Sequence, residues 1–237
     1  MRLRIPAVLS RSATKSPHTV RGRTLTSERE SREAFADDLM RTLGVERATR
    51  RYLLYFVLPL WIGAGLADWR RHRRTHIEAT AGTHESLIHS LMMTEIAIPI
   101  LMGLFLELDA LVLLVMIGTF FVHEATAYWD VSYAETLREV TPSEQHIHSF
   151  LEVLPFMTAS GMLCLHWDQA LALAGKGPER ARLTLRPKLH KLSRRYVTGI
   201  LSAVVAFVAV PYAEELWRCY RADHTLAAHP AAHPDVA

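Results

Sequence analysis

The sequence predicts an all-α integral membrane bundle of about five transmembrane helices, and two observations carry this prediction. First, the apolar residues, 50% of the 237-residue chain, are gathered into blocks separated by charged or polar segments. Several blocks approach the roughly 20 residues that a helix needs to cross a hydrocarbon core of about 30 Å. Second, the tryptophans lie mostly near the block ends, where amphipathic rings favour the membrane interface. The blocks are residues 52–67, 87–106, 110–129, 147–167 and 196–216.

Each block is expected to form a helix because a lipid-exposed backbone must satisfy its own hydrogen bonds. The first block is short, so we expect it to tilt or to lean on its neighbours. The alternative that the sequence leaves open is a soluble all-helical bundle with unusually apolar helices. The membrane interpretation implies an integral protein, and we expect it in a bacterial inner membrane.

Segments of different composition flank the blocks. Residues 1–27 are rich in Arg, Ser and Thr without any acidic residue, which is typical of a disordered basic arm or a transit peptide. Residues 28–51 mix both charges with apolar residues at helical spacing and predict an amphipathic interfacial helix. Residues 52–217 are then the transmembrane domain, and residues 218–237, with two His-Pro pairs, a flexible tail.

The charge and the cysteines exclude several classes of protein. The formal net charge is +3 and the isoelectric point is near 9, but the basic residues cluster beside the apolar blocks and at the N-terminus. Placement at a membrane surface explains them, and no motif for nucleic acid is present, so we expect no nucleic-acid partner. The two cysteines, Cys164 and Cys219, are too few for a disulfide framework or a zinc ribbon.

Histidines and carboxylates recur at four-residue spacing at the ends of these blocks. In "LADWRRHRRTHIEAT", Asp68, His72 and His76 line one stripe if the first helix continues past residue 67. The later blocks repeat this spacing or its two-turn equivalent, with Glu85 and His89, His123 and Asp130, and His148 and Glu152. Glu144 is assigned instead to a capping box, because it follows the predicted N-cap Thr141 by three residues.

These groups are expected to meet at one membrane face. In an up-and-down bundle, the ends of spans one and three lie on the same side as the starts of spans two and four. The link "ELDA" on the opposite side holds no histidine. We therefore predict a metal site surrounded by four of the helices. The candidate ligands are Asp68, His72, His76, Glu85, His89, His123, Asp130, His148 and Glu152.

The kinds of ligand indicate the metal. Nine imidazoles and carboxylates are too many for one ion and suit two ions about 3.5 to 4 Å apart. Imidazole with carboxylate and without thiolate is the set that non-haem iron, manganese or dinuclear zinc uses. We expect two metal ions, iron in the first place and zinc as the alternative.

The stretch "HRRTH", His72 to His76, resembles the first His-x-x-x-His box of the integral-membrane fatty-acid desaturase and hydroxylase superfamily. The similarity is one of pattern and covers residues 68–152. Where that family has adjacent histidine pairs, this sequence has "HESLIH", "HEATAYWD" and "EQHIHSFLE", which are richer in carboxylate. The resemblance implies a di-iron site at one membrane face and a dioxygen-dependent oxidoreductase. Its substrate would be lipid or quinol-like, with electrons from a donor protein or from quinol.

Other functions remain open at this stage. A zinc-dependent membrane hydrolase of the amidase kind also uses a His-x-x-x-His pair with an Asp and a further His. A metal or proton carrier is suggested by Glu95, an ionisable residue in the middle of the second block. The structural alternative is that Glu95 is protonated and forms a hydrogen bond with a neighbouring span. No catalytic residue is identified, and the side of the membrane that the metal face occupies is left open.

Overall fold

The computed structural model describes residues 17–228 of the chain, which divides into two units, Met1–Ala48 and Thr49–Ala237. Each unit is described by itself. Among the described residues every regular element is a helix, as predicted, and the isolated bridge between Leu106 and Pro187 is the single strand-like pairing.

Helix α1 (Pro17–Tyr52) makes up the described part of the first unit and continues into the second. Its start at Pro17 lies inside the segment 1–27, so the expected disordered arm is helical from that residue on, and residues 1–16 lie outside the described part. The side chains of Phe35, Leu39 and Leu43 follow each other at four-residue spacing and are exposed. These side chains would form the apolar face of the amphipathic interfacial helix predicted for residues 28–51.

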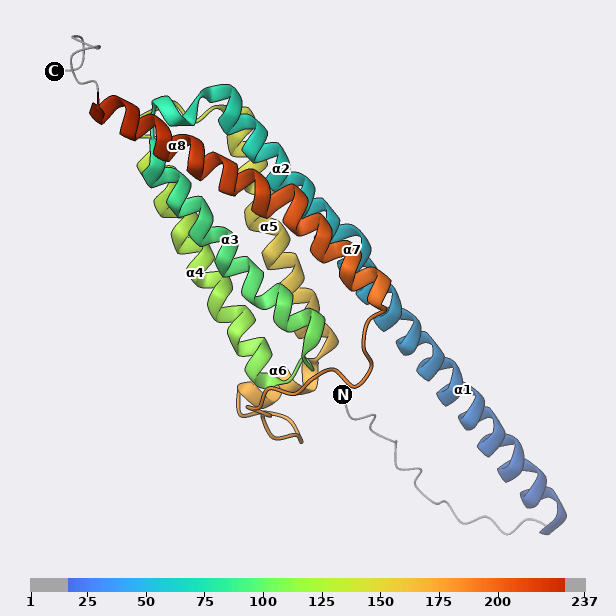
Figure 1. Cartoon of the computed structure of the whole chain (residues 1–237). Helices are drawn as coiled ribbons and strands as arrows, with labels where there is room; N and C mark the ends of the chain where they lie inside the picture. Colours follow the sequence, from blue (N-terminus) through green and yellow to red (C-terminus); the bar gives the residue numbers. More distant parts are fainter. Residues whose placement is uncertain (1–16, 229–237) are drawn as a thin grey trace. The chain divides into compact units, whose positions relative to one another are not determined.

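The second unit is a bundle of long helices (Figure 1). A π-helical turn (Leu53–Val57) joins α1 to α2, and a second π-helical turn (Val205–Ala209) joins α7 to α8. The helices are α2 (Leu58–Thr75), α3 (Gly82–Phe105), α4 (Ala110–Ala134), α5 (Pro142–Leu165), the short α6 (Trp167–Leu173), α7 (Arg194–Val204) and α8 (Val210–Ala228). Because α8 extends to Ala228, the tail predicted to begin at residue 218 is helical over its whole first half, and residues 229–237 lie outside the described part.

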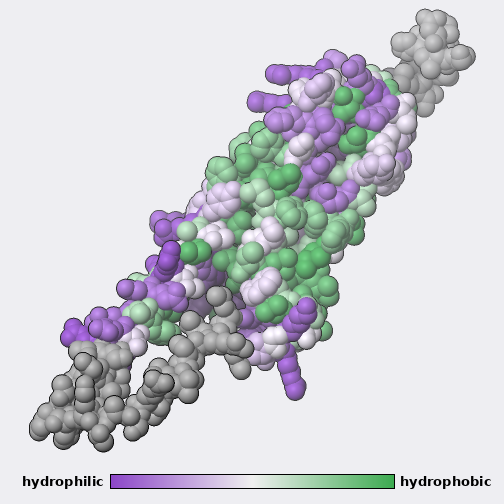
Figure 2. All heavy atoms as spheres, turned by 180° about the vertical axis from the view of Figure 1, so that it is seen from behind, coloured by the Kyte–Doolittle hydropathy of each residue, from purple (hydrophilic) through white to green (hydrophobic). Residues whose placement is uncertain are grey.

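Five helical stretches in the described chain are long and apolar enough to cross a membrane, which is the predicted number. They are Arg29–Thr75, Gly82–Phe105, Ala110–Ala134, Pro142–Leu165 and Arg194–Thr225. Large apolar side chains such as Phe121, Phe156 and Phe207 remain half to two thirds exposed on the outer faces of the bundle. Figure 2 shows this apolar surface over the middle of the bundle. Lipid accommodates such a surface, which water does not, so length, composition and surface together indicate a membrane protein.

Packing inside the bundle brings distant spans together. Helix α3 lies against α4 and α8, and α2 lies against α5. The buried core between them includes Trp61, Leu154 and Tyr212. At the start of α5 the predicted cap is present, since the Thr141 side chain accepts a hydrogen bond from the backbone N–H of Glu144.

The end of the bundle opposite the predicted ligands is held by charged contacts. Asp109, at the start of α4, accepts hydrogen bonds from Arg182 and Arg186 at 2.7 to 2.9 Å. Lys188 donates to the carbonyls of Gly103 and Leu106, which end α3. These contacts hold the loop between α6 and α7 against the α3–α4 turn.

Candidate metal centre

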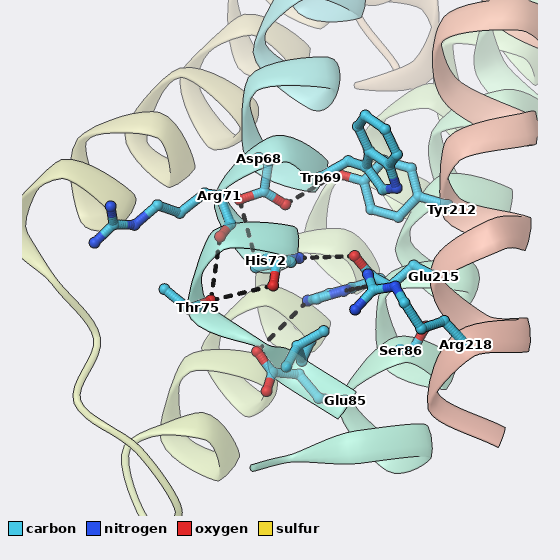
Figure 3. Close-up of polar contacts among 12 residues, drawn as sticks. Asp68, Trp69, Arg71, His72, Thr75, Glu85, Ser86, Tyr212, Glu215 and Arg218 are labelled. Atoms are coloured by element: carbon cyan, nitrogen blue, oxygen red, sulfur yellow. Dashed lines mark hydrogen bonds and ion pairs between the residues drawn. The ribbon is translucent and has the colours of Figure 1, made fainter. Parts of the chain in front are cut away.

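Ionisable side chains are buried together at the end of the bundle where α2 and α4 end and α3 and α5 begin (Figures 1 and 3). Helix α8 passes the same place. We call these residues the polar cluster: Asp68, His72, Glu85, His89, Asp130, Glu144, His148 and Glu215. Ionisable groups are expensive to bury unless they are paired or bind metal, so this concentration requires a physical explanation.

The first group of potential ligands consists of Asp68, His72 and His148. Asp68 and His72 are one turn apart on α2, and His148 faces them from α5. Nε2 of His148 lies 3.1 Å from Asp68 Oδ1, and Nε2 of His72 lies 3.6 Å from the same oxygen. Glu144 approaches from α5, with Oε1 at 3.7 Å from His72 Nε2. Imidazole and carboxylate atoms therefore converge on one point.

The second group consists of Glu85, His89 and Asp130. Glu85 and His89 are one turn apart on α3, and Asp130 comes from α4. Nε2 of His89 lies 3.3 Å from Asp130 Oδ2 and 3.9 Å from Glu85 Oε1. The first group has two histidines and one carboxylate, whereas this group has one histidine and two carboxylates.

Glu215 joins the two groups from α8. Its Oε2 lies 3.1 Å from Nδ1 of His72, and its Oε1 lies 2.9 Å from Nδ1 of His89. The two rings stack with centroids 4.5 Å apart and planes inclined by 5°. A carboxylate accepts hydrogen bonds only, so neutral imidazoles bound to it carry their proton on Nδ1 and present a lone pair at Nε2. The second nitrogen of a metal-binding histidine is usually oriented in this way.

The unpaired atoms of the cluster fit a metal ion. Nε2 of His72 and Nε2 of His89 are buried without a hydrogen-bond partner, as are Oδ1 of Asp130 and Oε2 of Glu144. A buried polar atom left unpaired costs about 1–3 kcal/mol, more when it is charged. All four atoms are of the kinds that bind transition metals; His72 belongs to the first group, His89 and Asp130 belong to the second, and Glu144 lies beside the first. Buried His, Asp and Glu side chains here can therefore hold a metal ion.

The polar cluster holds more carboxylates than guanidinium groups. Its five carboxylates are accompanied by the guanidinium groups of Arg138, which donates to both Glu85 and Glu144 at 2.5 Å, and of Arg71, which lies 4.0 Å from Glu144. Burial opposes the charge of Arg138, yet hydrogen bonds with Glu85 and Glu144 raise its pKa above the ordinary value. With neutral histidines, five carboxylates and two guanidinium groups leave an excess of three negative charges. Bound cations would offset this excess, as would protons on the three imidazoles.

Three of the nine predicted ligands lie outside both groups. His76 ends α2 in the left-handed conformation with φ of 55°, and its ring is exposed beside Glu78. The predicted stripe Asp68, His72, His76 is therefore wrong at its last member, because the helix ends at Thr75. His123 does share a face with Asp130, but it lies two turns away and contacts Glu95.

Glu152 is the third of these residues. It is half-buried and lines a small cavity with Asp68, His89, Asp130 and His148. The cavity volume is about 20 Å³, enough for one water molecule or ion. Glu152 therefore borders the polar cluster without belonging to either group.

Several cluster residues were missed by the sequence reasoning. The four predicted helices all contribute, and α8 adds Glu215 and Tyr212, whose hydroxyl donates to Asp68 Oδ2 at 2.9 Å. Glu144 fulfils its capping role through the backbone, but its side chain is fully buried in the cluster. Arg138 lies in the α4–α5 loop, where sequence offers no sign of its inward direction. For Glu215 a signal existed, since the end of span five lies on the same side as the ends of spans one and three.

An apolar cavity lies deeper in the same bundle. Its volume is about 90 Å³, and α2, α3, α4 and α5 line it together with the π-helical turn before α2. Several lining residues lie on the same helix faces as residues of the polar cluster. Trp61, Ile96 and Pro155 each stand seven positions from a cluster residue of the same helix: Asp68, His89 and His148. Seven residues are two turns, so cavity and cluster lie on the same helix faces, separated by a rise of roughly 10 Å.

No family model matches the chain, and neither a curated protein nor a solved structure shows significant similarity to it. The resemblance to histidine-box enzymes stays a prediction from the motif.

Proposed function

We propose that the polar cluster binds two metal ions, in the first place iron, and that the protein is a membrane oxidoreductase that uses dioxygen on a membrane-soluble substrate. One observation carries the proposal. Two groups of buried ligands have imidazoles that share Glu215 through Nδ1, which leaves both Nε2 atoms directed at carboxylates. Two ions held by these neighbouring groups would form a dinuclear centre, with Glu215 orienting one imidazole of each group.

Each ion has its own ligands in this proposal. Asp68, His72 and His148 hold the first, and Glu85, His89 and Asp130 hold the second. Three protein ligands leave positions open for dioxygen or substrate, and mixed carboxylate and imidazole ligation is the set that non-haem iron uses. Iron held by these residues would supply the reductive activation of dioxygen. Glu215 holds both imidazoles in position, and Arg138 offsets part of the carboxylate charge.

The apolar cavity supports a membrane-soluble substrate. Its lining is almost wholly aliphatic or aromatic, with Thr119 and Thr158 as the polar exceptions. Phe120 and Thr158 are only partly buried, so the cavity is within reach of the outer surface of the bundle. A substrate that enters between the spans would meet the ligands of the cluster two turns further on.

A zinc-dependent hydrolase is the second candidate. The group Asp68, His72 and His148 has two histidines and one carboxylate, the kind of set that binds catalytic zinc with one open position. That function requires one ion and leaves the second group without a role.

Elemental analysis of the purified full-length protein tests the proposal, with His72→Ala and His76→Ala as a matched pair. Both histidines belong to "HRRTH", but only His72 is buried in the cluster. We expect two irons per chain in the unmodified protein and in His76→Ala, and loss of at least one ion in His72→Ala. One zinc per chain would favour the hydrolase. Absence of metal, or equal retention in both variants, would overturn the proposal.

A further inference from the structure

The apolar cavity ends near a buried ionisable pair that the metal centre does not use. Glu95 on α3 and His123 on α4 are both buried, with Glu95 Oε2 at 3.5 Å from Nδ1 of His123. Thr126 donates to the other oxygen of Glu95 at 2.8 Å. Pro99 and Phe120, which line the cavity, lie about one turn from these two residues along the same helices. An ionisable pair at this depth of a membrane protein is a functional candidate.

Two prolines in the cavity wall add acceptors at the same place. Pro99 and Pro155 stand inside α3 and α5. Since proline has no N–H, the carbonyls four residues earlier, those of Glu95 and Leu151, lose their usual helical donors. The Leu151 carbonyl lies beside the His123 ring. The prolines thus leave two acceptors without helical donors near the pair.

The pair itself is incompletely satisfied. Neither ring nitrogen of His123 makes a hydrogen bond of good geometry, and Oε2 of Glu95 has no donor. Carboxylate, imidazole and carbonyl groups together form a region rich in acceptors about one helical turn from lining residues of the apolar cavity. A plain acyl chain would leave these acceptors unsatisfied, whereas a ligand with an apolar body and a hydroxyl end would donate to them.

We propose that the cavity binds a quinol, with one hydroxyl directed at the pair of Glu95 and His123. This inference rests on the proposed function and names its substrate class. Each quinol gives up two hydroxyl protons and two electrons and leaves as quinone. Two quinols reduce one dioxygen to two waters at the polar cluster, so no further reductant is required.

Different residues have different roles in the oxidation of the quinol. Glu95 and His123 accept hydroxyl protons, and Thr126 holds the Glu95 carboxylate in position. Electrons travel to the polar cluster over roughly 10 Å, the rise of the two turns between His123 and Asp130. The ring of the quinol packs among Trp61, Met116 and Phe120, which are apolar or aromatic.

Binding and turnover of a short-chain benzoquinol test the inference in full-length protein in lipid nanodiscs. Binding is measured on metal-free protein, so that it does not depend on the proposed centre. We expect His123→Ala to weaken binding by about tenfold, because it removes an acceptor. The exposed His146 serves as control, and His146→Ala should bind like the unmodified protein.

Glu95→Gln separates proton transfer from structure. The amide keeps an oxygen for the Thr126 hydrogen bond but accepts no proton, so quinol-dependent oxygen consumption should fall about 100-fold, the usual scale for a lost general base, with binding changed little. Metal content should be unchanged in both variants. Two irons per chain without quinol binding to the metal-free protein would overturn this inference alone. Quinol binding by a protein that is purified without metal and takes up none would overturn the proposed function.

Discussion

Glu215→Gln is the sharpest perturbation of the proposed centre. Glutamine has the shape of glutamate but only one acceptor oxygen, so it accepts the Nδ1 proton of only one of His72 and His89. Its amide group faces the other ring and donates to Nδ1. That ring must then carry its proton on Nε2, the atom that would bind metal. We expect the affinity for one ion to fall 10- to 100-fold, as is usual when the partner of a ligating histidine is lost, and the other ion to stay bound.

Metal titration of purified protein measures this effect, with free metal buffered across the binding range. Glu214→Gln is the matched control, because Glu214 is adjacent but part-exposed and contacts Trp69 and Arg218 outside the polar cluster. The control should keep both ions. Two ions at unchanged affinity in Glu215→Gln would refute the role of Glu215, as would an equal loss in Glu214→Gln.

Three further predictions concern stability. Arg138→Ala leaves Glu85 and Glu144 without their buried cation and should destabilise the metal-free protein by about 3 kcal/mol, measured by denaturant unfolding; an effect below 1 kcal/mol would contradict the pairing. Tyr212→Phe removes the donor to Asp68 and should cost about 1–3 kcal/mol without loss of helix content in circular dichroism. Chelation should lower the melting temperature, because each ion at 100 times its Kd contributes about 2.7 kcal/mol; a melting temperature indifferent to chelator would contradict metal binding.

The spans and their order were predictable because composition alone decides them. A lipid-exposed backbone must satisfy its own hydrogen bonds, so an apolar block of membrane length is expected to be a helix. The described structure has five such helical stretches. The spacing of Glu85 and His89 on α3 was equally predictable, since positions four apart share a face in any helix. The four-residue spacing identifies the helix face that carries the ligands, and the up-and-down topology identifies the end of the bundle where they meet.

The exact membership of the site was not predictable in the same way. Whether His76 continues the stripe of α2 depends on where the helix ends, and a left-handed residue at its C-terminus leaves no trace in the four-residue pattern. Glu144 has two roles at once, since its backbone N–H completes the cap of α5 while its side chain turns into the cluster. A local rule that fully explains a residue does not exclude a second role for its side chain.

Burial of charge explains why the fifth span belongs to the site. Glu215 is the acceptor for two imidazoles whose other nitrogens face carboxylates. Without it, each ring would carry its Nδ1 proton into an apolar interior, at about 1–3 kcal/mol for each unpaired donor. The same residue adds a fifth negative charge to a cluster that already holds four. A carboxylate that completes the hydrogen bonds of two imidazoles and adds negative charge requires a compensating positive charge, which bound cations or protons on the imidazoles would supply, and metal titration of the neutral and protonated site distinguishes the two.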